Sequence, residues 1–84
     1  MEIRYHKSFQ KQYKKLHQKI QLQTNKRLLL FEKNKHNKLL NNHSVDGVYP
    51  NCRSINITGD YRAIYTEQES VIVFILIGTH SELY

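Results

Sequence analysis

The chain has 84 residues and a formal net charge of +6. A chain of this length buries only about 60% of its unfolded surface, so we expect a single domain spanning residues 1–84. The sequence has no apolar run long enough to cross a bilayer and no apolar leader after Met1. We therefore expect no membrane partner and predict a cytoplasmic protein.

The cysteine and histidine content argues against a metal centre. Cys52 is the only cysteine, which excludes an internal disulfide and a thiolate cluster for zinc. The five histidines are nowhere three or four residues apart, so no two of them are paired across one turn of a helix. We predict no metal and no other cofactor, and we expect Cys52 to pack within a strand.

The charge is concentrated in the first half of the chain. Residues 1–38 carry a balance of +9, whereas residues 39–84 carry a balance of −3. A strongly basic half favours a polyanionic partner such as nucleic acid, because neutralised phosphates release counterions. The alternative is a lysine-rich helix face that is simply solvated.

The first half has the pattern of one strand and two helices. Residues 2–6 alternate as a short strand, and Ser8 can cap a helix. Its apolar stripe recurs at spacings of four, three and four, at Phe9, Tyr13, Leu16 and Ile20. A second helix is predicted from about residue 22 to residue 34. Its inward residues are expected to be Leu22, Leu29 and Leu30, with Leu28 or Phe31 at the margin.

The second half changes to the period of strands after an irregular bridge at 34–44. Arg53, Ile55 and Ile57 alternate with polar residues, 58–60 is typical of a hairpin turn, and 61–67 forms the next strand. Residues 71–77 are all apolar, so this strand is expected to be buried on both faces. We predict an α+β fold with two antiparallel helices on one face of a small, mostly antiparallel four-stranded sheet, in the order β-α-α-β-β-β.

Several residues near the strand ends suit the cleavage of RNA without a metal. Attack by a 2′-hydroxyl needs a proton acceptor, a proton donor and cations that stabilise the phosphorane. His80 is the candidate for proton transfer, and Arg62 and Arg53 offer forked donors for phosphate oxygens. Tyr84 and Tyr61 are candidates for stacking on bases.

Each of these residues also has a purely structural explanation. His80 is then a solvated residue after the last strand, and Asp60 is a turn-former beside glycine. Arg62 is then a solvent-facing strand residue whose aliphatic carbons pack on the sheet, and Tyr84 is a residue of a frayed chain end. The residue pattern alone indicates a small basic α+β protein that binds nucleic acid.

Three blocks of sequence carry a resemblance to a known family: HSVDG at 43–47, CRSINITGDYRAIY at 52–65 and VIVFILIGTHSELY at 71–84. Over essentially all 84 residues the chain resembles the RelE/ParE superfamily of bacterial toxins, and within it the YafQ-like mRNA interferases. The resemblance implies the RelE-like form of this fold and ribosome-dependent mRNA cleavage by metal-free 2′-hydroxyl attack. It also implies neutralisation by a cognate antitoxin.

The resemblance further implies roles for individual residues. It makes His80 and Asp60 proton-transfer or transition-state groups, with His43 as a supporting acid or base. It places Arg62 on the scissile phosphate and Tyr84 against the nucleotide. Arg53 occupies a commonly basic position, Tyr61 stands where YafQ has another aromatic, and we expect both of them and Asn56 to bind RNA. The basic helical half would then bind ribosomal RNA through Lys11, Lys14, Lys15, Lys19, Lys26 and Arg27.

One position departs from the YafQ pattern. Asn56 stands where YafQ has a further histidine, and an amide cannot transfer protons near neutral pH, although it can donate a hydrogen bond to RNA. Two alternatives therefore remain at this point. One is a ParE-like inhibitor of DNA gyrase without nuclease activity, and the other is an inactive relative that only binds its antitoxin.

Overall fold

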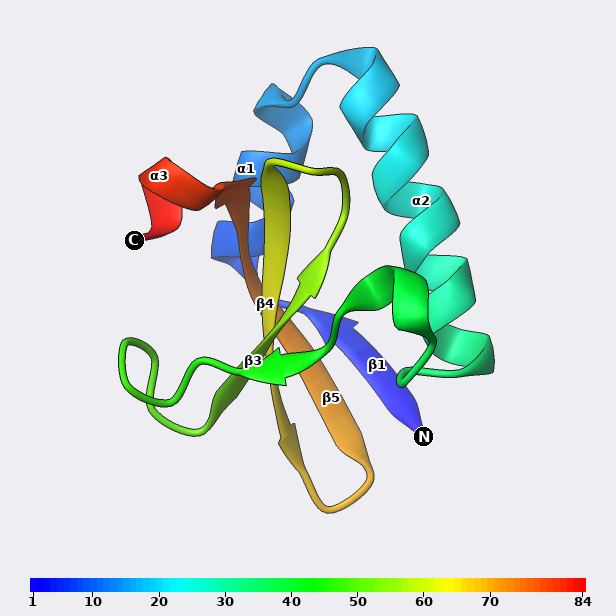
Figure 1. Cartoon of the computed structure of the whole chain (residues 1–84), viewed down its shortest axis with the longest axis vertical. Coiled ribbons are helices and arrows are strands. Elements are labelled where there is room, and N and C mark those ends of the chain that lie inside the picture. Colours follow the sequence, from blue (N-terminus) through cyan, green and yellow to red (C-terminus); the bar gives the residue numbers. More distant parts are fainter.

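A computed structural model describes residues 1–84 and has the α+β class that the sequence predicts (Figure 1). Helices and strands follow one another as β1 (Glu2–Tyr5), α1 (Lys7–Lys15), α2 (Gln18–Lys33), the 3-10 turn η1 (Lys38–Leu40), β2 (His43–Ser44), β3 (Cys52–Asn56), β4 (Tyr61–Gln68), β5 (Val71–Thr79) and α3 (His80–Leu83). None of these helices is both long and apolar enough to cross a membrane.

The sheet has five strands rather than the predicted four, in the order β1-β5-β4-β3-β2. β1 runs parallel to β5, and the other neighbouring strands are antiparallel. The additional strand is β2, which pairs His43 with Ser54 and Ser44 with Arg53. Two residues are too short for an alternation to be visible, so the bridge at 34–44 gave no strand signal.

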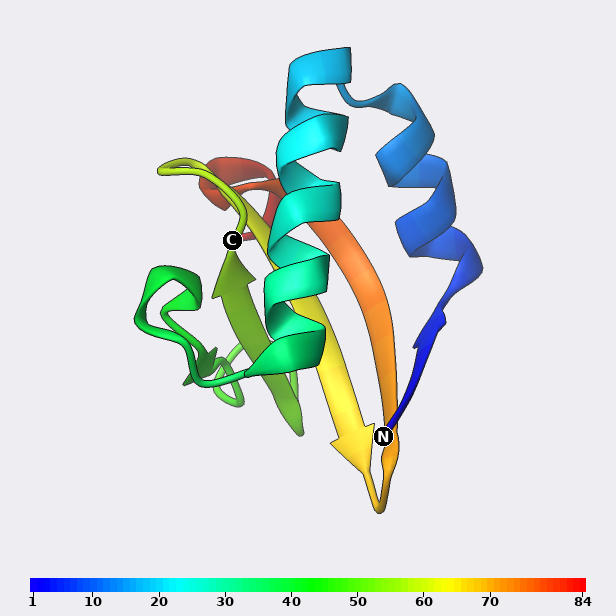
Figure 2. The ribbon, with the colours of Figure 1, turned by 90° about the vertical axis from the view of Figure 1, so that its right-hand side faces the viewer.

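The two helices begin at histidine caps and not at Ser8. The Nδ1 atom of His6 accepts from the amide of Ser8 at 3.1 Å, and Nδ1 of His17 accepts from the amide of Lys19 at 3.2 Å. The helical conformation is interrupted at Leu16, which caps the end of α1. Ile20 therefore belongs to α2, and the predicted first helix is too long. The helices run antiparallel from this break and spread apart away from it (Figures 1 and 2).

One face of the sheet packs on these helices and forms the main core. Its ten buried residues are Phe9, Phe31, Leu40, Ile55, Ile57, Ala63, Tyr65, Ile72, Phe74 and Ile77. The ring of Phe31 meets the rings of Tyr65 and Phe74 edge-on, with centroids 5.0 and 5.2 Å apart. Offset and edge-on aromatic pairs add to the stabilisation that burial provides.

The predicted inward face of α2 was right at Leu30, which packs against the core, and wrong at Leu22 and Leu29. Thr24 and Phe31 are fully buried, whereas Leu22 and Leu29 are 55% and 59% exposed. Positions seven apart share a helical face, so two stripes were available, one through Leu22 and Leu29 and one through Thr24 and Phe31. The apolar composition favoured the stripe with the two leucines. In the structure the stripe with the large aromatic ring of Phe31 packs on the sheet.

The expectation that β5 is buried on both faces was also only half right. Ile72, Phe74 and Ile77 are buried against the helices, but Val73, Ile75 and other residues of the opposite face are only half-buried. That second face is covered by a small cluster of Cys52, Ile64 and Leu83, with Val45 and Tyr49 against it. α1 and α3 thus lie on opposite sides of the sheet (Figure 2).

The edge of β5 beyond β1 is closed by polar side chains in place of a strand. Ser8 Oγ donates to the carbonyl of Ile75 at 2.5 Å, and Oε1 of Gln12 accepts from the amide of Ile77 at 2.9 Å. Oε1 of Glu82 accepts from the amide of Thr79 at 2.8 Å. These bonds satisfy an edge that would otherwise pair with another chain, and they fix α1 and α3 against β5.

Candidate active site

The strand ends of β4 and β5 meet the turn between β3 and β4 at one end of the sheet. Thr58 Oγ1 accepts from the amides of Asp60 and Tyr61 at 3.2 and 3.0 Å, which holds the turn closed. Arg62 lies opposite Gly78 in the ladder, and the amide of His80 donates to the carbonyl of Asp60 at 2.9 Å. The backbone therefore brings Asp60, Arg62 and His80 together.

The guanidinium of Arg62 is fixed by backbone carbonyls. Its Nη1 atom donates to the carbonyl oxygens of Thr58, Gly59 and Tyr61 at 3.1, 3.1 and 3.2 Å. Nε and Nη2 have no acceptor within the protein and form the free fork of the group. A fork held in this way is suited to two parallel bonds to a phosphate.

His80 is the first residue of the short helix α3, which was not predicted from the sequence. A capping box joins Thr79 and Glu82, with the Glu82 amide donating to Thr79 Oγ1 at 3.2 Å. The bonds from the Thr79 backbone and side chain lower the pKa of Glu82 below its usual 4.5. The motif Thr-His-Ser-Glu at 79–82 is the sequence signature of such a cap, so this signal was available.

The ring of His80 lies beside the ring of Tyr84, with centroids 4.8 Å apart. Tyr84 also meets Tyr49 edge-on at 5.9 Å, and the Tyr49 hydroxyl donates to the carbonyl of Leu83. The loop before β3 therefore anchors the C-terminal helix. Tyr49 carried no signal in the sequence that would have associated it with this site.

Leu83 and Gly78 determine how closely α3 approaches the sheet. Leu83 is buried against Cys52 and Ile64 on the face of the sheet opposite α1 and α2, which we call the open face. A side chain at Gly78 would lie 3.3 Å from Oε1 of Glu82 and 3.5 Å from Cδ2 of Leu83. The glycine thus leaves room for the helix that carries His80.

His43 and Asn56 lie on the same open face of the sheet as Arg62. His43 is paired with Ser54, and Asn56 is directly opposite Arg62. Nδ1 of His43 is 2.7 Å from the carbonyl of Asn41, which can only accept, so Nδ1 donates this bond and Nε2 is left for a ligand. Ser54 Oγ and Asn56 Oδ1 are buried without a hydrogen-bond partner.

Arg53, Tyr61 and the helix cations are not brought to this face. Nε of Arg53 donates to Oδ1 of Asn42 at 2.8 Å, on the side of Ile55 and the main core. Tyr61 packs against that same core, one residue from Arg62 but on the opposite face. The remaining cations lie on α1 and α2, on the far side of the sheet, at Lys11, Lys14, Lys15, Lys19, Lys26 and Arg27.

The candidate residues lie on an open surface. Two cavities, of about 210 and 450 Å³, are lined by neither His80 nor Arg62. No three His, Cys, Asp or Glu side chains are grouped so that they could hold a metal ion. Burial raises the pKa of the Cys52 thiol, and nearby Asp46 adds to this, so the thiol is a packing group.

Comparison with solved structures shows which class of proteins shares this fold. The E. coli YafQ crystal structure matches with a TM-score of 0.78 and 20% identity, over 99% of this chain and 97% of that one. The YoeB/ParE toxin from Agrobacterium tumefaciens matches at 0.77 and 16%, over 95% and 99%. RelE in the RelB–RelE antitoxin–toxin complex from Methanococcus jannaschii matches at 0.76 and 20%, over 96% and 94%. The fold is therefore that of the RelE/ParE-like toxins.

The family is shown by sequence. The family model described as the bacterial toxin of type II toxin–antitoxin system, YafQ, matches residues 1–84. The chain belongs to this YafQ family of toxins. No curated protein matches the chain.

Proposed function

We propose that the chain cleaves mRNA on the ribosome by metal-free attack of a 2′-hydroxyl on the adjacent phosphorus. The observation that carries the proposal is the arrangement at the sheet end, where the amide of His80 bonds the carbonyl of Asp60 and carbonyls hold the guanidinium of Arg62 two residues further along β4. Family membership supports the same function.

Arg62 holds the scissile phosphate in this scheme. Nε and Nη2 form two charge-assisted bonds to its non-bridging oxygens, and these bonds strengthen as negative charge develops on the phosphorane. Three carbonyls fix Nη1, so little reorganisation is needed when the charge appears. Asn56, directly opposite Arg62, supplies an amide donor beside the same phosphate.

The two histidines lie on opposite sides of this phosphate position. In sheet order, His80 follows β5, Arg62 is on β4, Asn56 on β3 and His43 on β2. β2 is about 10 Å from β4, because neighbouring strands are about 4.8 Å apart. In-line attack needs a base on one side of phosphorus and an acid on the other, so His43 Nε2 suits the 2′-hydroxyl and His80 suits the leaving 5′-oxygen. In this scheme Asp60 orients His80, and Tyr84 orients the nucleotide.

The proposed partners follow from the same scheme. The lysines of α1 and α2 bind ribosomal RNA while mRNA crosses the open face, which locates the toxin in the cytoplasm. Relatives are known in antitoxin complexes, such as E. coli DinJ–YafQ and M. jannaschii RelB–RelE. We infer a cognate antitoxin here, with an acidic segment that folds on the basic surface.

The decisive test substitutes His80→Ala and maps mRNA cuts by primer extension with and without ribosomes. Loss of proton transfer predicts cleavage at least about 10²-fold slower, with an unchanged thermal melt. His36→Ala is the matched control, since His36 is exposed in the loop after α2. Full cleavage by the His80→Ala variant would refute the assignment.

The same experiment separates the alternatives. Gyrase-linked DNA breaks without mRNA cuts would identify a ParE-like inhibitor. Absence of any growth arrest in a host without antitoxin would identify an inactive relative, and Asn56→His would then be the variant to restore activity.

A further inference from the structure

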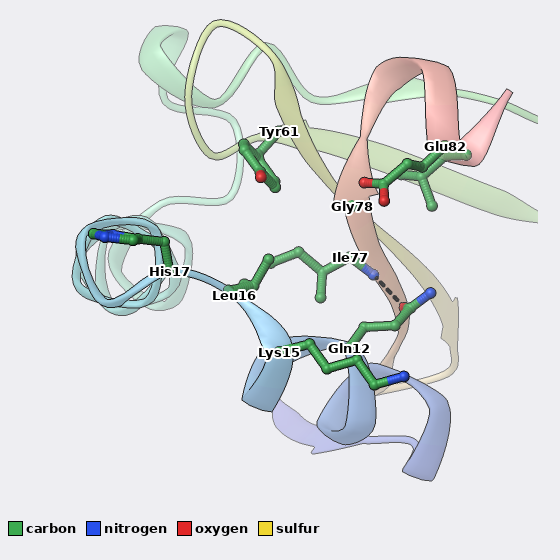
Figure 3. Close-up of a pocket in the computed structure, with 9 residues that line it drawn as sticks. Gln12, Lys15, Leu16, His17, Tyr61, Ile77, Gly78 and Glu82 are labelled. Carbon is green, nitrogen blue, oxygen red and sulfur yellow. Dashed lines mark hydrogen bonds between the residues drawn. The ribbon is translucent and has the colours of Figure 1, made fainter.

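The cavity of about 210 Å³ lies between α3 and the junction of α1 with α2, at the same sheet end as the candidate active site (Figure 3). Tyr61 lines it from β4 and Gly78 from β5, so the cavity and the catalytic candidates share two strand ends. It is smaller than the roughly 300 to 1,000 Å³ of pockets for drug-sized ligands. Its size therefore suits one planar ring system.

The polar groups around the cavity include one acceptor and at least two donors. Oε1 of Glu82 is occupied by the amide and hydroxyl of Thr79 at 2.8 and 2.9 Å, which leaves Oε2 free to accept. Oε1 of Gln12 is occupied by the amide of Ile77, which leaves its NH₂ group free to donate. Lys15 adds an ammonium group at the edge.

The aromatic surface is supplied by Tyr61. Its ring and the carboxylate of Glu82 face the same space above Ile77 and Leu16, as Figure 3 shows. The Tyr61 hydroxyl has no hydrogen-bond partner within the protein. His17 also borders the cavity, but its ring points away and its Nδ1 caps α2. The imidazole of His17 is therefore not available to a ligand in the cavity.

We propose that this cavity binds a nucleobase of the mRNA strand, next to the nucleotide pair that is cleaved. The proposal rests on the proposed function for the identity of the strand. The base would stack on Tyr61, donate to Oε2 of Glu82, and accept from Gln12 or Lys15. Single-stranded RNA is read in this way, by aromatic stacking and by hydrogen bonds to base edges.

Charge distinguishes a base from the other ligand classes. A phosphate would face the Glu82 carboxylate, whose pKa is lowered and which stays ionised at neutral pH. A cationic side chain of a protein partner would face Lys15 and leave the free NH₂ of Gln12 without an acceptor.

The free oxygen of the Glu82 carboxylate also predicts a preference among bases. Adenine, cytosine and guanine carry an exocyclic amine beside an acceptor, which matches Glu82 next to Gln12 and Lys15. Uracil offers one ring N–H between two carbonyl oxygens, and at least one of these would face the carboxylate. We expect bases with an amine to bind at least several-fold more tightly than uracil.

The first test titrates the labelled full chain with AMP, GMP, CMP and UMP while the amide signals of Lys15, Gly78 and Glu82 are followed by NMR. The three amine-bearing nucleotides should shift these signals at millimolar concentrations, and UMP should shift them more weakly. Ribose 5-phosphate and argininamide are the controls for a phosphate site and for a protein partner. Equal shifts with either control, or none with any nucleotide, would overturn the proposal.

The second test uses variants in the same titration. Tyr61→Leu should weaken binding about tenfold while Tyr61→Phe retains it, because only stacking is removed. Glu82→Gln keeps the capping box and should abolish the preference for an amine. Lys33→Gln, a charge change near the far end of α2, is the matched control and should bind as the native chain does.

Cleavage mapping then separates the two proposals. If native toxin cuts mRNA but Glu82→Gln leaves the base profile around the cut unchanged, the pocket proposal fails and the nuclease stands. If no variant cuts mRNA but the titration shows base-dependent binding, the nuclease proposal fails and the pocket stands.

Discussion

The two faces of the sheet differ in how much apolar surface they bury and in whether their buried polar atoms are hydrogen-bonded. The helix-covered face holds ten buried residues around Phe31, Tyr65 and Phe74, with nearly continuous apolar contact. The open face holds a cluster of three buried apolar residues, and next to them two buried polar atoms without partners, on Ser54 and Asn56. One face supplies the stability, and the other tolerates unsatisfied polar groups, as functional surfaces do.

The largest expected effect concerns the helix-covered face. Phe31→Ala should destabilise the chain by about 3–5 kcal/mol, because a fully buried ring is replaced by a cavity. Leu29→Ala, two residues away on the exposed face of α2, should change stability by less than about 0.5 kcal/mol. Urea unfolding measures both, and Phe31→Leu replaces the alanine variant if that one does not fold. A similar cost at both positions would contradict the assigned face of α2.

On the open face, Leu83→Ala should cost about 2 kcal/mol, near the lower limit for buried leucines. Leu83 docks α3 on Cys52 and Ile64 at the chain end, so its loss should release His80 without unfolding the sheet. Hydrogen exchange should increase in α3 and in the loop around Tyr49, and mRNA cleavage should fall. Unchanged exchange in α3 would show that the capping box alone holds the helix.

A smaller effect of opposite sign is expected at Ser54. Its hydroxyl is buried without a partner, so Ser54→Ala should stabilise the chain by about 1 kcal/mol. Chemical denaturation of the purified variant measures this gain. A loss of stability would mean that the hydroxyl is hydrogen-bonded in solution.

The smallest effect concerns pH and α3. The folded-state pKa of Glu82 lies below its usual 4.5, so its contribution is complete above that pH and is lost as the pH falls through the folded value. The amide resonance of Thr79 should report this titration, with a midpoint below 4.5. Glu82→Gln should abolish the transition, and a midpoint above 4.5 would contradict the capping arrangement.

The candidate site could be predicted only where residues are close in sequence or joined by the ladder. Asp60 ends the predicted turn and Arg62 follows it, whereas His80 is joined to them by its bond to the carbonyl of Asp60, just beyond the ladder of β4 with β5. Arg53 and Arg62 both alternate with isoleucines, and the pattern did not say that they point to opposite faces. Only the contacts of Arg53 with Asn42 and of Arg62 with the turn distinguish them.

The sequence by itself determined the class of fold, the hairpin turn and the separation of a basic helical half from the strands. These follow from local properties, namely periodicity, turn chemistry and charge. Tertiary structure alone decided which stripe of α2 faces the sheet, that residues 43–44 form a fifth strand, and that Tyr61 lines a cavity behind Arg62. The reason is physical: each of these choices depends on how a side chain or a short segment fits surfaces formed by residues far away in the chain.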